Sequence, residues 1–91
     1  MKAIWKFPIL VVDNQQIAMP EGAEILCVQM HRGEPCLWAM VNPDRPKEQR
    51  AVEVFGTGNP IKSDMGTSRK YIGTFQMLAG DLVFHVFESM M

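Results

Sequence analysis

The first residues of the chain alternate between polar and apolar side chains with a period of two. Lys2 and Lys6 stand at even positions, whereas the odd positions are all apolar: Ala3, Trp5, Phe7 and Ile9. Successive side chains of a β-strand point to opposite faces, so this pattern predicts a strand with one buried face. Trp5 then belongs to the core, although a tryptophan can also stack on a planar ligand.

Two later segments are apolar on both faces. Residues 36–41 carry Cys36, Trp38 and Met40 on one face and Leu37, Ala39 and Val41 on the other. The segment from Leu82 to Glu88 is again apolar on both faces apart from His85. A strand of this kind is typical of the centre of a fold, where both of its faces are covered. We therefore expect residues 36–41 to run through the middle of the core, with Trp38 packed inside.

The remaining strands are weaker and are separated by turn signals. They are residues 17–19, a short edge strand ended by Pro20; residues 23–30, with Leu26, Val28 and Met30 on one face; residues 50–55, with Val52 and Val54 inward; and residues 71–77, where Gly73 indicates a bulge or a close packing point. Long polar loops are expected at 42–49 and 61–69. The chain is predicted to be all-β, an antiparallel six- to seven-stranded sandwich or small open barrel, in one domain of residues 1–91.

The turn at Arg32-Gly33 predicts a hairpin that sets the positions of both cysteines. In this register Cys27 faces Trp38, and Cys36 faces Gln29. The two thiols then meet only diagonally, which is poor geometry for a disulfide. We expect two reduced, buried thiols and no zinc site, because two cysteines at this spacing are too few.

Composition narrows the classes of partner. The 91 residues are 47% hydrophobic and carry a net charge of −1, so no basic excess exists to neutralise nucleic-acid phosphates. No segment approaches the ~20 apolar residues of a membrane span. Asp13 ends the first apolar run before it reaches the length of a signal-peptide core, so we expect a cytoplasmic protein without membrane contact. A small core and eight methionines favour a homo-oligomer.

Six segments in order resemble a family of short proteins of unknown function encoded in phages and prophages. They are Ile4–Pro8 (IWKFP), Met19–Leu26 (MPEGAEIL), Pro35–Ala39 (PCLWA), Gly56–Ile61 (GTGNPI), Tyr71–Gln76 (YIGTFQ) and Leu82–Glu88 (LVFHVFE). The resemblance covers nearly the whole chain and implies a viral gene product that works in the cytosol of a bacterial host, or an accessory piece of a virion. It implies no catalytic or binding residue.

A short glycine-containing segment offers the strongest candidate for a ligand site. Two glycines that flank a threonine can shape the backbone of Gly56, Thr57, Gly58 and Asn59 into a nest of N–H groups that binds an anion. Arg69, Lys70 and Lys62 are the cations that would complete it. The alternative is a turn after a strand, because the segment lacks both the P-loop ending and the third glycine of a dinucleotide fingerprint.

The other polar residues suggest structural roles. His85 shares a face with Val83 and Phe87, where it is expected to satisfy one buried hydrogen bond, and His31 is expected to be solvated. Two imidazoles are too few for a metal site. Tyr71 and Phe75 are expected on one face of their strand. Residues 44–48 suit a solvated loop, and Ser63, Asp64 and Ser68 lack the surroundings of a hydrolase serine.

Three classes of function follow from these observations. The first is a phage accessory protein that acts as a binding module, engaging a host protein or sequestering a small anionic ligand such as a nucleotide. The alternative is a structural or virion-accessory protein. An enzyme is the least supported class, because no nucleophile–base or carboxylate pair can be placed. No cofactor is expected.

Overall fold

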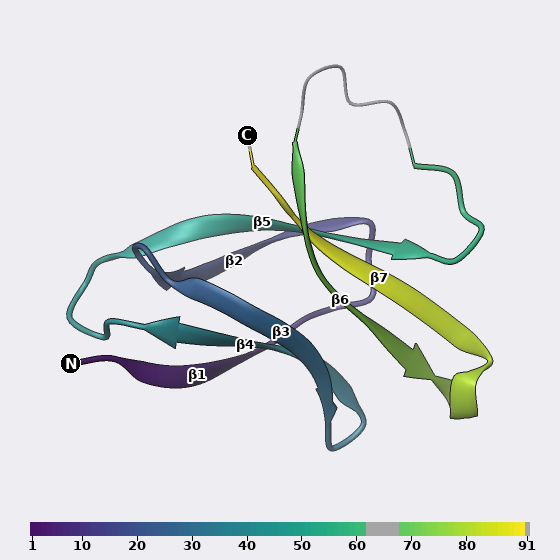
Figure 1. Cartoon of the computed structure of the whole chain (residues 1–91), viewed down its shortest axis with the longest axis horizontal. Coiled ribbons are helices and arrows are strands. Elements are labelled where there is room, and N and C mark those ends of the chain that lie inside the picture. Colours follow the sequence, from purple (N-terminus) through teal and green to yellow (C-terminus); the bar gives the residue numbers. More distant parts are fainter. Residues whose placement is uncertain (62–67, 91) are drawn as a thin grey trace.

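The computed structural model describes residues 1–61 and 68–90 and contains seven strands (Figure 1). Lys62, Ser63 and Asp64, which entered the predictions above, lie outside the described residues. The strands are β1 (Ala3–Pro8), β2 (Asn14–Pro20), β3 (Glu24–His31), β4 (Glu34–Val41), β5 (Lys47–Gly56), β6 (Arg69–Met77) and β7 (Leu82–Ser89). A single 3₁₀ turn, η1 (Leu78–Gly80), separates β6 from β7.

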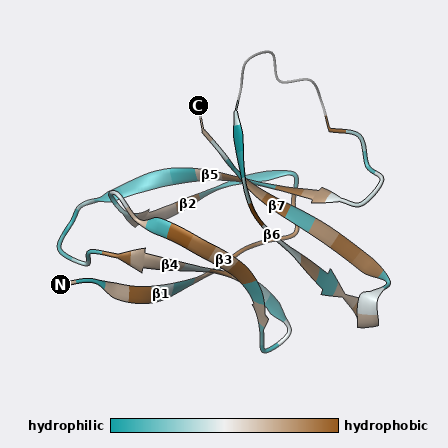
Figure 2. Cartoon of the chain, in the orientation of Figure 1, coloured by the Kyte–Doolittle hydropathy of each residue, from teal (hydrophilic) through white to brown (hydrophobic). Residues whose placement is uncertain are grey.

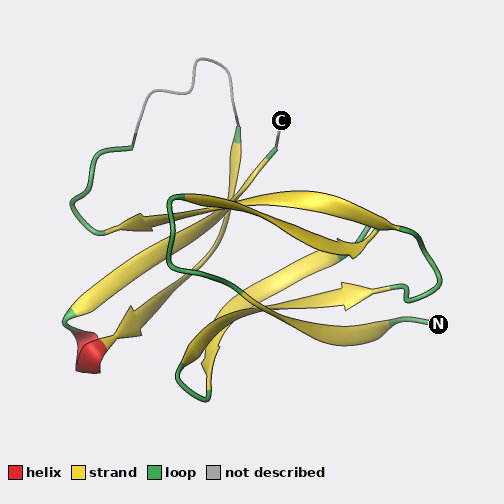
Figure 3. Ribbon diagram, turned by 180° about the vertical axis from the view of Figure 1, so that it is seen from behind, coloured by secondary structure: helices red, strands yellow, loops and turns green. Residues whose placement is uncertain are grey.

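The strands form two antiparallel sheets, which confirms the all-β prediction and favours a sandwich over a barrel. One sheet has the order β1-β4-β3 and the other the order β2-β5-β7-β6. The chain enters the first sheet at β1, crosses to β2, returns for the β3–β4 hairpin, and finishes in the second sheet (Figures 1 and 3). Within the described part of the chain the sheets do not close into one continuous barrel.

Strand β5 begins earlier than the sequence predicted. The expected loop of residues 42–49 ends at Pro46, because residues 47–49 pair with residues 18–20 of β2. Lys47 and Glu48 are charged, so the sequence of this segment is typical of a surface loop. β5 is an inner strand, but its pairing with β7 begins only at Val52, so residues 47–49 pair with β2 alone. A segment paired on one side tolerates charged side chains, and its pairing with β2 decides its conformation.

The β3–β4 hairpin has the predicted register. Cys27 pairs with Trp38 and Gln29 pairs with Cys36, around a turn in which Arg32 and Gly33 both have positive φ. Two successive positive φ values are the signature of a type I′ turn, whose twist suits a hairpin. The register breaks between Ile25 and Cys27, which leaves Leu26 40% exposed. The prediction that Leu26 shares an apolar face with Val28 is therefore wrong.

The core lies between the two sheets and is made mainly of β-branched and aliphatic side chains. Val28 and Leu37 of the first sheet meet Val52, Val54 and Val86 of the second; each is at most 4% exposed. The contact between sheets is closest where β3 meets β6, because Gly73 lies directly against Val28. Gly73 therefore combines the bulge and the close packing point that were predicted as alternatives.

The bulge in β6 separates two aromatic residues that were expected to share a face. The register shifts between Tyr71 and Gly73, so Tyr71 pairs with Phe87 and Phe75 pairs with Phe84. Phe84 and Phe87 stand on opposite faces of β7. Phe75 is consequently buried in the core, whereas Tyr71 is 56% exposed on the outer face. The prediction that Tyr71 and Phe75 share a face is therefore wrong.

Figure 2 shows that β7 is apolar along most of its length, whereas β5 begins with hydrophilic residues. Within residues 1–61 and 68–90, no helix has the length and apolar composition needed to cross a membrane.

Candidate functional site

The segment from Gly56 to Asn59 forms a tight turn after β5. The Asn59 N–H donates to the Gly56 carbonyl at 3.1 Å, and Gly58 has a φ of 84°. A positive φ at the third position of a four-residue turn is characteristic of type II and requires glycine there. The Thr57 N–H donates to the Val83 carbonyl at 3.0 Å. Two of the N–H groups that an anion nest would use are therefore occupied within the chain.

The two described cations of the predicted nest point in different directions. The Arg69 Nε donates to Glu53 Oε1 at 2.7 Å, and the Arg69 guanidinium stacks over the Phe55 ring at 5.3 Å. Lys70 is the next residue of β6, so its side chain projects from the other face of the sheet, in register with Glu88. Only Arg69 is brought near the turn.

Gly56, Asn59 and Arg69 do meet, around one small pocket. Its volume is about 170 Å³, and it is lined by Asp13, Asn14, Glu53, Val54, Phe55, Gly56, Asn59, Pro60 and Arg69. Ligand pockets commonly measure about 300–1,000 Å³. Among the described residues of this lining, two carboxylates outnumber one guanidinium, and their charge opposes an anion. The predicted site residues come together only in part, and in surroundings that suit an anionic ligand poorly.

His85 lies on the outer face of the four-stranded sheet and is hydrogen-bonded at both ring nitrogens. Its Nε2 is 2.6 Å from Thr57 Oγ1, and its Nδ1 is 3.0 Å from Thr74 Oγ1. The Tyr71 hydroxyl lies 2.5 Å from Thr74 Oγ1, and the Thr57 hydroxyl donates to the Val83 carbonyl at 3.3 Å. One consistent set of donors therefore runs from Tyr71 through Thr74 and His85 to Thr57, and ends on a carbonyl that can only accept.

This chain of hydrogen bonds differs from a catalytic triad in the group at Nδ1. In a catalytic triad the nucleophile and its base lie within hydrogen-bond reach, as Thr57 and His85 do in this protein. The base of a triad is normally oriented by a third group such as a carboxylate. Here the third group is the Thr74 hydroxyl. The arrangement fastens the Gly56–Asn59 turn to β7. The sequence placed His85 on one face with Val83 and Phe87, but the expected single buried hydrogen bond is wrong, because His85 makes two on the solvated outer face.

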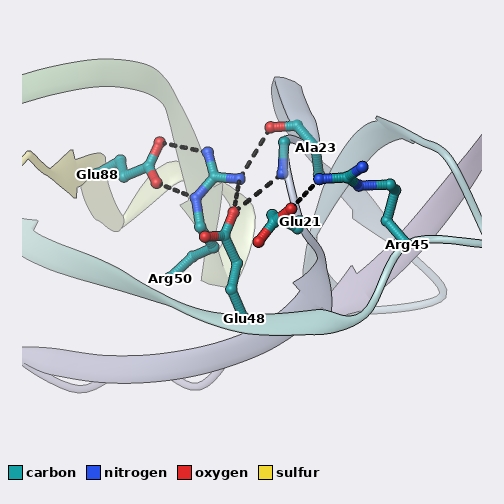
Figure 4. Close-up of polar contacts among 7 residues, drawn as sticks. Glu21, Ala23, Arg45, Glu48, Arg50 and Glu88 are labelled. Carbon is teal, nitrogen blue, oxygen red and sulfur yellow. Dashed lines mark hydrogen bonds and ion pairs between the residues drawn. The ribbon is translucent and has the colours of Figure 1, made fainter.

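A charged cluster at one end of the sandwich was missed by the sequence analysis (Figure 4). Arg50 donates to both carboxylate oxygens of Glu88, at 2.5 and 3.0 Å, and to the Ala23 carbonyl at 2.8 Å. Glu48 lies 3.6 Å from Arg50 and accepts from the Gly22 N–H at 3.0 Å. The hydrogen bond to Glu88 is the main reason that the pKa of Arg50 is raised, although burial acts in the opposite direction.

The alternation of inward and outward side chains along β5 and β7 indicated this cluster in the sequence. Arg50 stands two residues before Val52, and Glu88 two residues after Val86, so both charged side chains point toward the buried face. Glu88 is only 6% exposed. Two in-phase charges of opposite sign on neighbouring strands indicate a buried ion pair.

The outer face of the β1-β4-β3 sheet carries apolar side chains at its centre. Leu37, Ala39 and Val41 belong to the core, so the alternate residues of β4 point the other way: Cys36, Trp38 and Met40. Their register partners on this face include Ile4 of β1, which is 59% exposed, and Cys27 of β3. In the described part of the chain, this sheet contacts the other sheet mainly through its inner face, where Val28 of β3 packs against Gly73 of β6.

The prediction that β4 is covered on both sides holds only in part, because Cys36 is buried on the outer face whereas Trp38 and Met40 are half-buried there. Trp38 is half-buried by its neighbours on the same sheet, and its ring lies 5.7 Å from that of His31. The indole N–H of Trp38 is buried without an acceptor in the described structure. Trp5 points to the inner face as predicted but is 37% exposed, because β1 is an edge strand. Neither tryptophan is a fully buried core residue.

The two cysteines, both free, are expected to differ in reactivity. Cys36 is 1% exposed, and burial raises the pKa of its thiol, whereas Cys27 is half-buried. The thiolate is the reactive form, and the buried Cys36 thiol must first be exposed by local opening of the fold. Each 1.4 kcal/mol of that opening free energy slows alkylation about tenfold. Iodoacetamide at pH 8 should therefore alkylate Cys27 faster than Cys36 by roughly tenfold or more. Peptide mapping of timed samples measures both rates. Equal alkylation rates for the two thiols in the folded protein would contradict this placement. In denaturant both thiols are exposed, so equal rates are expected there.

Among the described residues, no group of three or more His, Cys, Asp or Glu side chains is arranged to hold a metal ion. A family model described as a domain of unknown function (DUF7352) matches residues 1–91. The chain belongs to this family. The DUF7352 match spans all six segments that resembled proteins of unknown function, and it assigns no activity to any of them. No curated protein and no solved structure matches the chain.

Proposed function

We propose that this DUF7352 protein is a phage accessory protein that acts as a non-enzymatic binding module in the cytosol of a bacterial host. We propose that the outer face of the β1-β4-β3 sheet is the surface that binds a partner protein. The observation that carries this proposal is β4 itself: the strand is apolar on both faces, but on the outer face Trp38 and Met40 stay half-buried beside Ile4, which is 59% exposed. Uncovered apolar faces rimmed by polar residues mark interaction sites on soluble proteins.

The residues of this face have the character of a protein interface. Trp38 and Met40 occupy its centre, and aromatic residues and methionine are enriched at such centres. Lys6 and His31 lie toward its rim, where Lys6 Nζ is 3.1 Å from His31 Nδ1. The phage origin is supported by the six ordered segments of the sequence, from the IWKFP segment to the LVFHVFE segment.

A small anionic ligand is less well supported than a protein. The turn at Gly56–Asn59 uses two of its N–H groups internally, and the adjoining pocket is small and rich in carboxylates. An apolar sheet face has no depth to enclose a small molecule, whereas a flat surface of this kind suits the surface of a protein.

Substitution of Ile4 by glutamate tests the proposal. The tagged protein is incubated with a bacterial lysate and then with purified candidate proteins, and bound proteins are quantified by mass spectrometry. Wild type is expected to retain at least one protein, or an untagged copy of itself, and Ile4→Glu should reduce that retention about tenfold or more, because a buried charge costs several kcal/mol without a partner.

Leu78→Glu is the matched control. Leu78 is 68% exposed and lies in η1, away from the β1-β4-β3 sheet, so this variant adds the same charge elsewhere. Met40→Gln, at the register partner of Ile4, is a second variant that adds no charge. Retention that is equal for wild type, Ile4→Glu and Met40→Gln, with all three folded by circular dichroism, would overturn the proposal.

A further inference from the structure

We infer that the groove between β3 and β6 binds an extended peptide segment of a partner protein, which adds as a β-strand between the two sheets. The groove has a volume of about 350 Å³ and is lined by residues 28–30 of β3 and 74–76 of β6. β3 is the last strand of one sheet and β6 the last strand of the other, and no ladder joins them among the described residues. The groove follows these strand edges rather than the outer face of the β1-β4-β3 sheet, so the inference goes beyond the proposed function.

The backbone of β6 directs unpaired polar groups toward this groove. The Thr57 N–H donates to the Val83 carbonyl at 3.0 Å, so the backbone groups of Val83 point to β5. Gln76 is the register partner of Val83 on β6, and Thr74 is the partner of His85, two residues along. The N–H and C=O of one residue point to the same side of a strand, so these two are non-hydrogen-bonded pairs of the ladder. The backbone groups of Thr74 and Gln76 therefore point away from β7, toward the unpaired edge.

The backbone of β3 directs unpaired polar groups toward the same groove. The Ile9 N–H donates to the Pro35 carbonyl at 3.0 Å, so the backbone of Pro35 points to β1 and not to β3. Met30 is the register partner of Pro35, and Val28 stands two residues earlier, so both direct their N–H and C=O groups away from β4. The packing of Gly73 agrees with this direction, because a Cβ atom there would lie 3.7 Å from Val28 N and 3.9 Å from Val28 O.

The two other sheet edges, β1 and β2, are blocked against an added strand. The same reasoning places Lys6 and Pro8 at outward-pointing backbone positions of β1, and Pro20 at such a position of β2. Proline and lysine are common means of blocking an exposed edge. None of the four residues whose backbone points into the groove is a proline or a lysine. The edges that line the groove are therefore the ones left open to strand addition.

A β-strand is the occupant that matches two facing edges. Its N–H and C=O groups alternate between its two sides, so one extended segment can bond to both edges at once. β3 and β6 run in the same direction (Figure 1), so a strand that is antiparallel to one of them is antiparallel to the other. Val28 and Phe75 line the groove and are each at most 4% exposed, which favours an apolar side chain at the inward positions of the added strand.

The contact between Gly73 and Val28 limits the length of the added strand. The two strands already touch there, so the segment enters only beyond this contact. The lining of the groove then accommodates about three residues in extended conformation, or about 10 Å. Each hydrogen bond contributes about 0.5–1.5 kcal/mol, so the segment alone should bind weakly, with a dissociation constant of about 10 μM or above.

Proline substitutions test this site. Peptides are selected from a random heptapeptide library on immobilised wild-type protein, and their dissociation constants are measured by fluorescence anisotropy. Met30→Pro and Gln76→Pro each remove one N–H that points into the groove and should weaken binding about tenfold or more. Ala18→Pro is the matched control, because the Ala18 N–H points outward from the β2 edge. Proline is tolerated at such edge positions, and thermal unfolding confirms that each variant is folded.

Hydrogen exchange of the wild-type protein gives a second readout that needs no variant. The amides of Met30 and Gln76 have no partner in either ladder and should exchange rapidly in the free protein. A selected peptide at saturating concentration should slow their exchange about tenfold or more, because each amide then donates to the added strand. Unchanged exchange at both amides in the complex would contradict strand addition.

The outcomes separate this inference from the proposed function. If no peptide is selected, or if peptides bind Met30→Pro and Gln76→Pro as tightly as Ala18→Pro, the inference is overturned and the two edges are solvated only. Ile4→Glu should leave peptide binding within about threefold of wild type. Peptide binding that depends on Ile4 but not on Gln76 overturns the inference and leaves the proposed function standing. Peptide binding that depends on Gln76 alone supports the inference, even where lysate retention is unaffected by Ile4→Glu and the proposed function fails.

Discussion

Replacing Arg50 with alanine is expected to lower the free energy of unfolding by about 3–5 kcal/mol. Glu88 is 6% exposed, and both of its carboxylate oxygens accept from Arg50. Removal of the guanidinium leaves the buried carboxylate without its partner and also leaves the Ala23 carbonyl without its donor. Because small domains are stable by only about 5–15 kcal/mol, this loss removes a large share of the stability, and Arg50→Ala should unfold at a clearly lower urea concentration than wild type.

A double variant separates the buried charge from the loss of packing. Arg50→Met with Glu88→Leu removes both charges and fills similar volume, a change that is often neutral in other proteins. We expect it to recover most of the stability lost in Arg50→Ala, as measured by urea unfolding. Arg45→Ala is the matched control, because Arg45 pairs with Glu21 on the surface, and exposed pairs contribute about 0–1 kcal/mol. If Arg50→Ala unfolded at the same urea concentration as Arg45→Ala, the buried pair would not stabilise the fold as described.

Replacing Gly73 with alanine is expected to destabilise the domain by about 1–3 kcal/mol. A Cβ atom at this position would lie 2.9 Å from Val28 Cγ1. Val28 is buried, and its branched side chain has little freedom to move away. The strands β3 and β6 would have to separate where the two sheets are in closest contact. Urea unfolding measures the loss.

The matched control combines Gly73→Ala with a smaller side chain at Val28, the residue that the new methyl group would contact. Val28→Ala alone should cost stability because it leaves a cavity, but in Val28→Ala/Gly73→Ala the new methyl group occupies part of that space. The double variant should therefore be more stable than the sum of the two single effects predicts. Strict additivity would contradict the contact between Gly73 and Val28.

Local features of the fold could be predicted from the sequence. The β3–β4 register followed from the turn at Arg32-Gly33, since a two-residue turn fixes which residues pair. The bulge at Gly73 was visible as a glycine inside an apolar strand. Its consequence was missed, however, because one extra residue in a strand moves Tyr71 and Phe75 to opposite faces.

Features that depend on the order of strands could not be predicted. Arg50 and Glu88 are 38 residues apart, and they meet only because β5 lies next to β7. Arg69 meets Glu53 because β6 and β5 flank the same strand. Periodicity showed that β4 is apolar on both faces but not what covers each face. A sequence pattern reports burial preference and cannot distinguish a second layer of the same chain from another molecule.

The most direct test of the binding-module account is native mass spectrometry of the freshly purified wild-type protein beside Ile4→Glu. The account predicts that wild type carries no retained small molecule and forms a protein–protein complex that Ile4→Glu lacks. A monomeric wild-type protein with a retained small molecule, indistinguishable from Ile4→Glu, would contradict it and would return attention to the pocket beside the Gly56–Asn59 turn.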